Sequence, residues 1–143
     1  MLQTVSRVVP ALVLFVGTAG ATHYFMSFTQ TVMHRALGHR PIGRKFFRNH
    51  LDFHHAYYRG NHLVSRTYHG DEGNNTPFFF IPVCLFGVGA FFILPLYLFV
   101  ALVIGCAGSF YMHVFLDKEY HVEGSRLRRF AWFRRKQELH FVH

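Results

Sequence analysis

Five histidines lie close together in the first half of this chain, in two clusters. The first cluster is His34 with His39, and the second is His50 with His54 and His55. Neutral imidazole is the commonest protein ligand for zinc, iron and copper, and it also exchanges protons near neutral pH. On an α-helix, His50 and His54 lie about 40° apart on one face, and His55 adds a third nitrogen one step round. The spacing therefore predicts a metal site, with a solvated histidine face as the alternative.

The pair His34 and His39 is spaced by five residues, which does not align the two side chains on an ideal α-helix. We expect Gly38 to end or distort a helix between them, so that His39 can turn back. Asp52 lies between the histidines of the second cluster. A carboxylate there is placed to orient ligating imidazoles through their second nitrogen, as metal-bound histidines usually require.

Further candidate ligands lie near the end of the chain. His113, Asp117 and His121 are spaced by four, and a helix would align them in one stripe. His140 and His143 are spaced by three, which also puts them on one helical face. The alternative for the stripe is a polar boundary at the end of a membrane span.

The whole set contains more ligands than one octahedral ion can use, whereas two ions with open positions can use them. Imidazole-rich sites with some carboxylate suit iron, and two irons with open positions can activate dioxygen; zinc fits the same ligands. The predicted ligands are His34, His39, His50, His54, His55, His121, His140 and His143, with Asp117 and His113 as further candidates.

The composition indicates a membrane protein. Of the 143 residues, 51% are hydrophobic, 18 are phenylalanine and only 15% are charged. The two cysteines lie in apolar runs without CxxC spacing, which argues against a disulfide framework or a thiolate metal site.

The net charge of +8 is concentrated at 35–66 and 126–136. A basic chain can bind nucleic acid, but beside membrane spans positive loops mark the cytoplasmic side, so we expect no nucleic-acid partner.

Apolar stretches predict an all-α integral membrane protein with about three spanning helices, at 8–28, 77–92 and 95–115. The last two form one apolar run, and Pro95 marks a turn near its middle. The first stretch could instead be a secretory signal, because Ala19-Gly20-Ala21 looks like a cleavage site. We favour a retained helix, because the apolar run continues beyond that triplet and cleavage would export the basic loop that follows.

Two polar segments, 29–76 and 117–143, lie on the same side of the membrane if the chain crosses three times. Both are basic and are therefore expected to be cytoplasmic, as a helical, histidine-rich, metal-binding cap on a single domain, 1–143. Residues 60–76 are expected to form a loop. Trp132, with Phe130 and Phe133, is typical of an aromatic anchor at the membrane interface.

From His34 to the end, the chain resembles the fatty acid hydroxylase superfamily, which comprises membrane-bound non-haem di-metal oxidoreductases and includes sterol desaturases. The resemblance is carried by histidine boxes, which here read His34-x4-His39, His50-x3-His54-His55 and His140-x2-His143. It implies two iron ions, dioxygen, and an external electron donor such as cytochrome b5 or ferredoxin. It also implies hydroxylation or desaturation of a C–H bond of a membrane lipid of the fatty acyl, sterol or carotenoid type.

The chain departs from the family pattern at two places. Asp117 stands where many members of the family carry a histidine, four residues before the position of His121, and a carboxylate changes the charge and potential of an iron site. The last box of the family ends in two adjacent histidines, whereas this sequence stops at His143. We therefore expect a chain truncated at its C terminus; a chain complete at His143 would lack one ligand.

Two other classes of function use the same sequence differently. A membrane electron carrier would bind haem between His23 and His113, near the ends of two spans, although the remaining histidines would then be unexplained. A histidine-rich metal transporter would use the boxes as a loading site. That interpretation is weakened because the ionisable residues cluster outside the predicted spans rather than along a pore.

Overall fold

The computed structural model describes residues 2–70 and 72–142, with side chains for 8–70 and 75–142, and it is all-α. Its long helices are α1 (Leu2–Met33), α3 (Glu72–Ile93) and α4 (Leu96–His121). Three helical stretches are long and apolar enough to cross a membrane: Val8–Gly38, Asn75–Ile93 and Leu96–His121. The three predicted spans are thus confirmed as helices of spanning length, which is compatible with a membrane protein.

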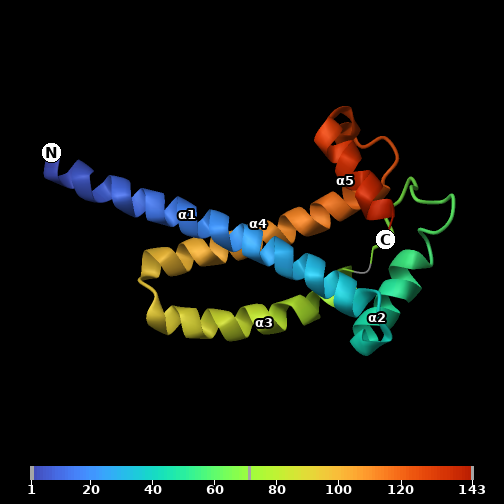
Figure 1. Ribbon diagram of the computed structural model, residues 1–143, viewed down its shortest axis with the longest axis horizontal. Coiled ribbons are helices and arrows are strands. Elements are labelled where there is room, and N and C mark those ends of the chain that lie inside the picture. Colours follow the sequence, from blue (N-terminus) through green and yellow to red (C-terminus); the bar gives the residue numbers. More distant parts are fainter. Residues whose placement is uncertain (1, 71, 143) are drawn as a thin grey trace. The chain divides into compact units, whose positions relative to one another are not determined.

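The bounds of these helices differ from the predicted ones. The predicted membrane spans ended near residues 28 and 115, whereas α1 continues to Met33 and α4 to His121. The continuation of α4 agrees with the helical stripe predicted for His113, Asp117 and His121. α3 begins at Glu72, so part of the predicted loop 60–76 is helical. Hydropathy marks only the apolar part of a helix, and backbone hydrogen bonds continue through polar residues. The expected turn at Pro95 is present, as the short connection between α3 and α4 (Figure 1).

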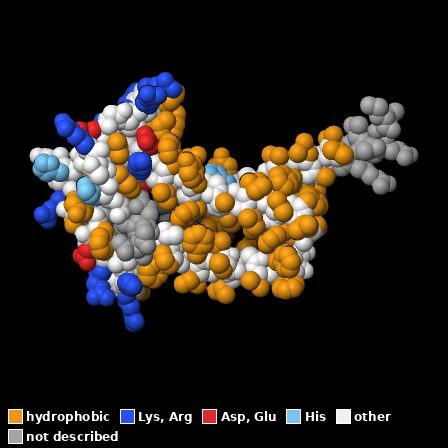
Figure 2. Space-filling model, turned by 180° about the vertical axis from the view of Figure 1, so that it is seen from behind, with side chains coloured by type: hydrophobic (Ala, Val, Ile, Leu, Met, Phe, Trp, Pro, Cys, Tyr) orange, Lys and Arg blue, Asp and Glu red, His pale blue; other side chains and the backbone are white. Residues whose placement is uncertain are grey.

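The chain divides into two compact units. The first contains the residues up to Met33 and Pro77–Met112. Its helices expose many large apolar side chains, including Val13, Leu85 and Phe92. Figure 2 shows hydrophobic side chains along these helices. Apolar faces of this kind are expected on helices that face lipid.

Within the first unit, α1 and α4 approach each other at Gly105. A Cβ atom on Gly105 would lie 2.5 Å from the carbonyl oxygen of Ala19 and 2.7 Å from the Cβ of Thr22. Near this crossing, the buried Gln30 and Ser109 form a hydrogen bond of 3.2 Å, in which the serine hydroxyl donates. Small residues and polar bonds between helices are the usual means by which membrane helices pack.

Replacement of Gly105 with leucine is expected to force α1 and α4 apart, because the backbone of Ala19 cannot yield to a new side chain. We expect a loss of about 2–3 kcal/mol in the free energy of unfolding. Thermal unfolding of the purified protein in detergent measures it. Gly108 is a matched control on the same helix, since no atom lies within 4 Å of a Cβ built there. Equal losses for Gly105→Leu and Gly108→Leu would contradict the close approach.

The second unit contains His34–Thr76 and His113–His143, so the two polar segments predicted to converge do form one unit. Its elements are short and follow one another closely. They are the π-helical turn η1 (His34–Gly38), the 3₁₀ turn η2 (Pro41–Gly43), α2 (Lys45–Asn49), the π-helical turn η3 (His50–His55), the end of α4, the 3₁₀ turn η4 (Arg126–Arg129) and α5 (Ala131–Phe141). Figure 2 shows Lys and Arg side chains on its surface.

The loop between η3 and α3 is fastened to the end of α4 by an isolated parallel bridge between Ser65 and Val122. The Ser65 N–H donates to the carbonyl of His121, and the Glu123 N–H donates to the carbonyl of Ser65, both at 2.9 Å. These two bonds fix the path of the loop past the last turn of α4.

α5 packs on Tyr120. The ring of Phe133 is fully buried, with its centroid 5.1 Å from that of Tyr120, and the Gln137 amide donates to the Tyr120 carbonyl at 2.6 Å. Phe133 is therefore a core residue, and its assignment to an interfacial anchor was wrong. Phe130, which precedes this short helix, and Trp132 remain exposed.

Candidate metal centre

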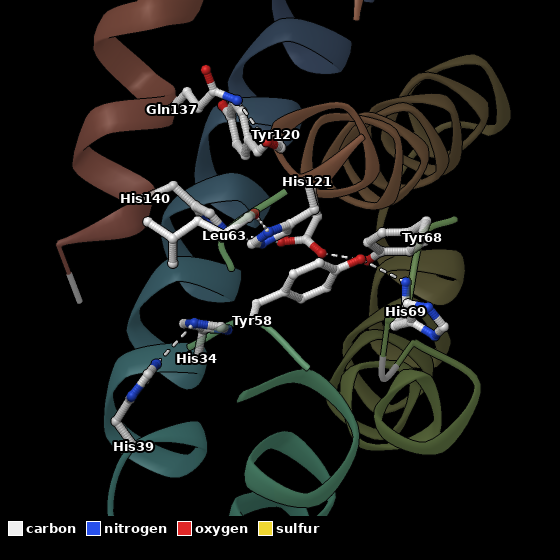
Figure 3. A network of polar contacts seen from close by, with 11 residues as sticks. His34, His39, Tyr58, Leu63, Tyr68, His69, Tyr120, His121, Gln137 and His140 are labelled. Carbon is white, nitrogen blue, oxygen red and sulfur yellow. Dashed lines mark hydrogen bonds and ion pairs between the residues drawn. The ribbon is translucent and has the colours of Figure 1, made fainter. Parts of the chain in front are cut away.

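His34 begins the π-helical turn η1, His39 directly follows its last residue, and His50, His54 and His55 lie on the π-helical turn η3. A π-helix closes i→i+5 hydrogen bonds, so residues five apart lie one above the other, as they do not on an α-helix. His34 and His39 have this spacing, and their Nε2 atoms lie 3.1 Å apart (Figure 3). The distortion expected near Gly38 is this π turn, and it explains how a spacing of five brings two imidazoles together.

The first group of candidate ligands is His34, His39 and His50, whose ligand atoms all lie within 4.8 Å of one another. The ring of His50 is 4.4 Å from that of His34 and 4.9 Å from that of His39, between centroids. His55 lies beside this group, with its ring centroid 4.7 Å from that of His50. All four residues are predicted ligands.

The second group is His54, Asp117, His121 and His140, whose ligand atoms also lie within 4.8 Å of one another. They come from η3, α4 and α5, so residues far apart in the sequence meet here. The Nε2 atoms of His121 and His140 are 2.9 Å apart, and Nε2 of His140 is 3.4 Å from Oδ1 of Asp117. Of the predicted stripe His113, Asp117 and His121, all three residues lie on α4, but only Asp117 and His121 belong to this group.

The spacing of the nitrogens fits a shared metal ion. Two nitrogens that bind one ion at about 2.1 Å and at a right angle to each other lie roughly 3.0 Å apart. The Nε2 pairs of His34 with His39 and of His121 with His140 are separated by 3.1 and 2.9 Å. Each group therefore contains a pair of nitrogens at a separation that is compatible with binding one metal ion.

The two groups are neighbours because η3 contributes to both. His50 belongs to the first group and His54 to the second, and their rings stack with centroids 5.1 Å apart. Both side chains are buried. A single π turn thus supplies ligands to two adjacent candidate metal positions.

Two contacts outside the groups hold the ligands in place (Figure 3). The Leu63 carbonyl lies 2.8 Å from Nδ1 of His121, and since a carbonyl can only accept, Nδ1 carries the proton and Nε2 presents its lone pair to the group. The Tyr68 hydroxyl donates to Oδ2 of Asp117. Neither contact was predicted from the sequence, because a main-chain carbonyl and a loop tyrosine are not placed at a fixed number of residues from the histidines that they support.

A cavity of about 240 Å³ lies beside the second group. Three of its ligands line it, together with apolar, basic and aromatic side chains from the loop and from α5. The lining residues are His54, His55, Tyr58, Arg59, Gly60, Leu63, His121, His140 and Phe141. The cavity is large enough for a small molecule next to those ligands.

The remaining candidates lie elsewhere. His113 is half-buried on α4 and belongs to neither group, as the described residues define them. His143 lies outside the described residues. Asp52 is exposed on η3, so its predicted orienting role stays a prediction. His23, the other candidate haem ligand, is on α1 in the first unit, whereas His113 is in the second.

Replacement of the buried Tyr58 with phenylalanine is expected to destabilise the second unit. The Tyr58 hydroxyl accepts the His69 N–H at 2.7 Å, and its ring stacks on His121 at 3.9 Å between centroids. Phenylalanine keeps the stacking and leaves the His69 N–H without this acceptor, at a cost of about 1–2 kcal/mol. Chemical denaturation measures the loss. The exposed neighbour Tyr57 is the matched control, and a similar loss for Tyr57→Phe would contradict the assignment.

Comparison of the chain with protein-family models gives no matching family, and neither the curated proteins nor the solved structures give a match.

Proposed function

We propose that the chain is a membrane-embedded di-iron oxidoreductase, which uses dioxygen to hydroxylate or desaturate a C–H bond of a membrane lipid. The observation that carries the proposal is the pair of adjacent ligand groups on one π turn, one with three imidazoles and one with three imidazoles and a carboxylate. Imidazole with some carboxylate suits iron. The substrate class is a lipid of the fatty acyl, sterol or carotenoid type, in keeping with the resemblance of the histidine boxes.

Iron in both groups would activate dioxygen, which is the oxidant that an unactivated C–H bond requires. The chain's own residues would hold the ions and orient their ligands. His34, His39 and His50 hold one ion, with His55 beside them, and His54, Asp117, His121 and His140 hold the other. The Leu63 carbonyl accepts the proton on Nδ1 of His121, so the neutral imidazole would bind the ion through Nε2. The cavity gives a small molecule access to the second group.

The membrane helices support a lipid substrate, since three stretches are long and apolar enough to cross a bilayer. The basic segments 35–66 and 126–136 favour a cytoplasmic position for the ligand groups. On that side an external electron donor such as cytochrome b5 or ferredoxin would deliver reducing equivalents. Zinc would fit the same ligands and would not support this redox reaction.

The test is expression of the full chain with and without His121→Ala, followed by metal analysis of the purified protein and mass spectrometry of the cell lipids. The proposal expects about two iron ions per chain and a hydroxylated or newly unsaturated lipid that the variant does not form. A chain that binds no iron, or a lipid profile that is the same for both proteins, would refute it.

A further inference from the structure

The two ligand groups differ in charge. The first contains only histidines, which bind a metal ion as neutral imidazole, whereas the second also contains the carboxylate of Asp117. The side chain of Asp117 is only 15% exposed and that of His140 is 14% exposed. In such a poorly solvated place, a negative charge interacts strongly with a bound cation, because little water screens it.

The carboxylate of Asp117 is held from both ends. The Tyr68 hydroxyl donates to Oδ2, and Oδ1 lies 3.4 Å from Nε2 of His140, within the ligand group. Tyr68 belongs to the loop that the Ser65–Val122 bridge fastens to α4. The loop therefore fixes the rotation of the carboxylate, so that one oxygen faces the group while the other is occupied by the hydroxyl.

We propose that the two metal positions are inequivalent: the second group binds a divalent cation first and more tightly, through Asp117, and Tyr68 is the positioning residue for that carboxylate. The inference rests on the proposed function only in taking both groups to bind metal. A dication among neutral imidazoles keeps its full charge, whereas Asp117 neutralises half of it. The ion that binds second is also repelled by the first, which widens the difference between the two binding steps.

The test uses Co²⁺ alone as the probe, followed by its visible absorption. The full chain in detergent micelles is stripped with a chelator and titrated. We expect two Co²⁺ ions to bind per chain, in two steps whose dissociation constants differ by at least about tenfold. The Asp117 carboxylate strengthens the first step, and repulsion between the two bound ions weakens the second. Replacement of Asp117 in the second group and of His34 in the first group then assigns each binding step to one group.

Asp117→Asn is expected to weaken the tight step by about 100-fold or more, since removal of even an outer partner of a ligand costs roughly 10–100-fold. Tyr68→Phe keeps the carboxylate and loses the hydroxyl, so it should weaken the same step by about tenfold and leave the weak step unchanged. His34→Ala should remove the weak step and retain the tight one. Circular dichroism and gel filtration confirm that each variant is folded.

Glu123→Gln is the matched charge control, because Glu123 lies two residues beyond His121 and pairs with Arg66 in an exposed ion pair. It should change neither step. Two steps of equal affinity, a tight step that survives Asp117→Asn, or a chain that binds fewer than two Co²⁺ ions would each overturn the inference. Two steps that behave as expected in a chain that forms no lipid product would instead refute the proposed function and leave the inference standing.

Discussion

Alanine in place of His54 is expected to remove metal from the second group and to lower any lipid product at least about 100-fold, beyond the cost of losing an outer partner. His54 is 3% exposed, and its ring centroid lies 4.7 Å from that of His121. It is the member of the second group contributed by η3, and its ring stacks on His50 of the first group. Its loss therefore affects the point where the two groups meet.

The measurement is the ratio of metal to protein for the purified variant, together with its lipid product. His62→Ala is the control, because His62 is exposed in the loop and belongs to neither group, as the described residues define them. The variant protein should contain one ion or fewer, and the control should contain as much metal as the unaltered chain. A His54 variant with unchanged metal content would show that η3 does not bind metal through this residue.

Alanine in place of Gly43 is expected to disrupt the first group, although Gly43 is not a ligand. A Cβ atom there would lie 1.9 Å from the carbonyl oxygen of Leu37 and 2.7 Å from its carbonyl carbon. Leu37 belongs to η1, the π turn that begins with His34. The backbone of residue 43 fixes the position of the new Cβ, and the atoms that it meets are backbone atoms of Leu37. No side chain can therefore turn aside, and the 3₁₀ turn and the π turn must move apart. We expect the variant to lose the ion of the first group and about 2–4 kcal/mol of stability.

Gly38→Ala separates this effect from the general effect of an added methyl group. A Cβ atom on Gly38 would have its nearest neighbours at 3.4 Å, on the side chains of His50 and Phe46, which is a close contact that side chains can accommodate. Metal analysis and thermal unfolding of both variants make the comparison. If the Gly43 variant retained the metal content and melting temperature of the unaltered chain, the close approach of η2 to η1 would be disproved.

The all-α class and the three long helices were predictable because apolar runs of spanning length have few alternatives. The ends of the helices were less predictable. At the end of α4, the polar residues Asp117 and Lys118 lie beyond the predicted span, where hydropathy alone gives no signal, and only the spacing of His113, Asp117 and His121 predicted that the helix continues. They are helical in the structure, and the helix presents Asp117 and His121 to one group of ligands.

The candidate site was predictable as a set of residues but not as two groups. Spacing places His50 and His54 on one face of either kind of helix, yet the two residues belong to different groups. The π geometry of η1 and η3 depends on a local choice between i→i+4 and i→i+5 hydrogen bonds, which hydrophobic periodicity does not encode. Tyr68 reaches Asp117 across 49 positions of sequence, a distance over which no local pattern can act.

The main-chain carbonyl that accepts the proton of His121 comes from a loop whose course is set by two bonds to the end of α4. Because every amino acid carries that oxygen, many different side chains at position 63 could preserve the protonation of the imidazole. A mutational scan that measures metal content should therefore find broad tolerance at Leu63 and damage from a lengthened or shortened loop. The protonation of Nδ1 of His121 therefore depends on the length of the loop that places the Leu63 carbonyl, and not on which side chain stands at position 63.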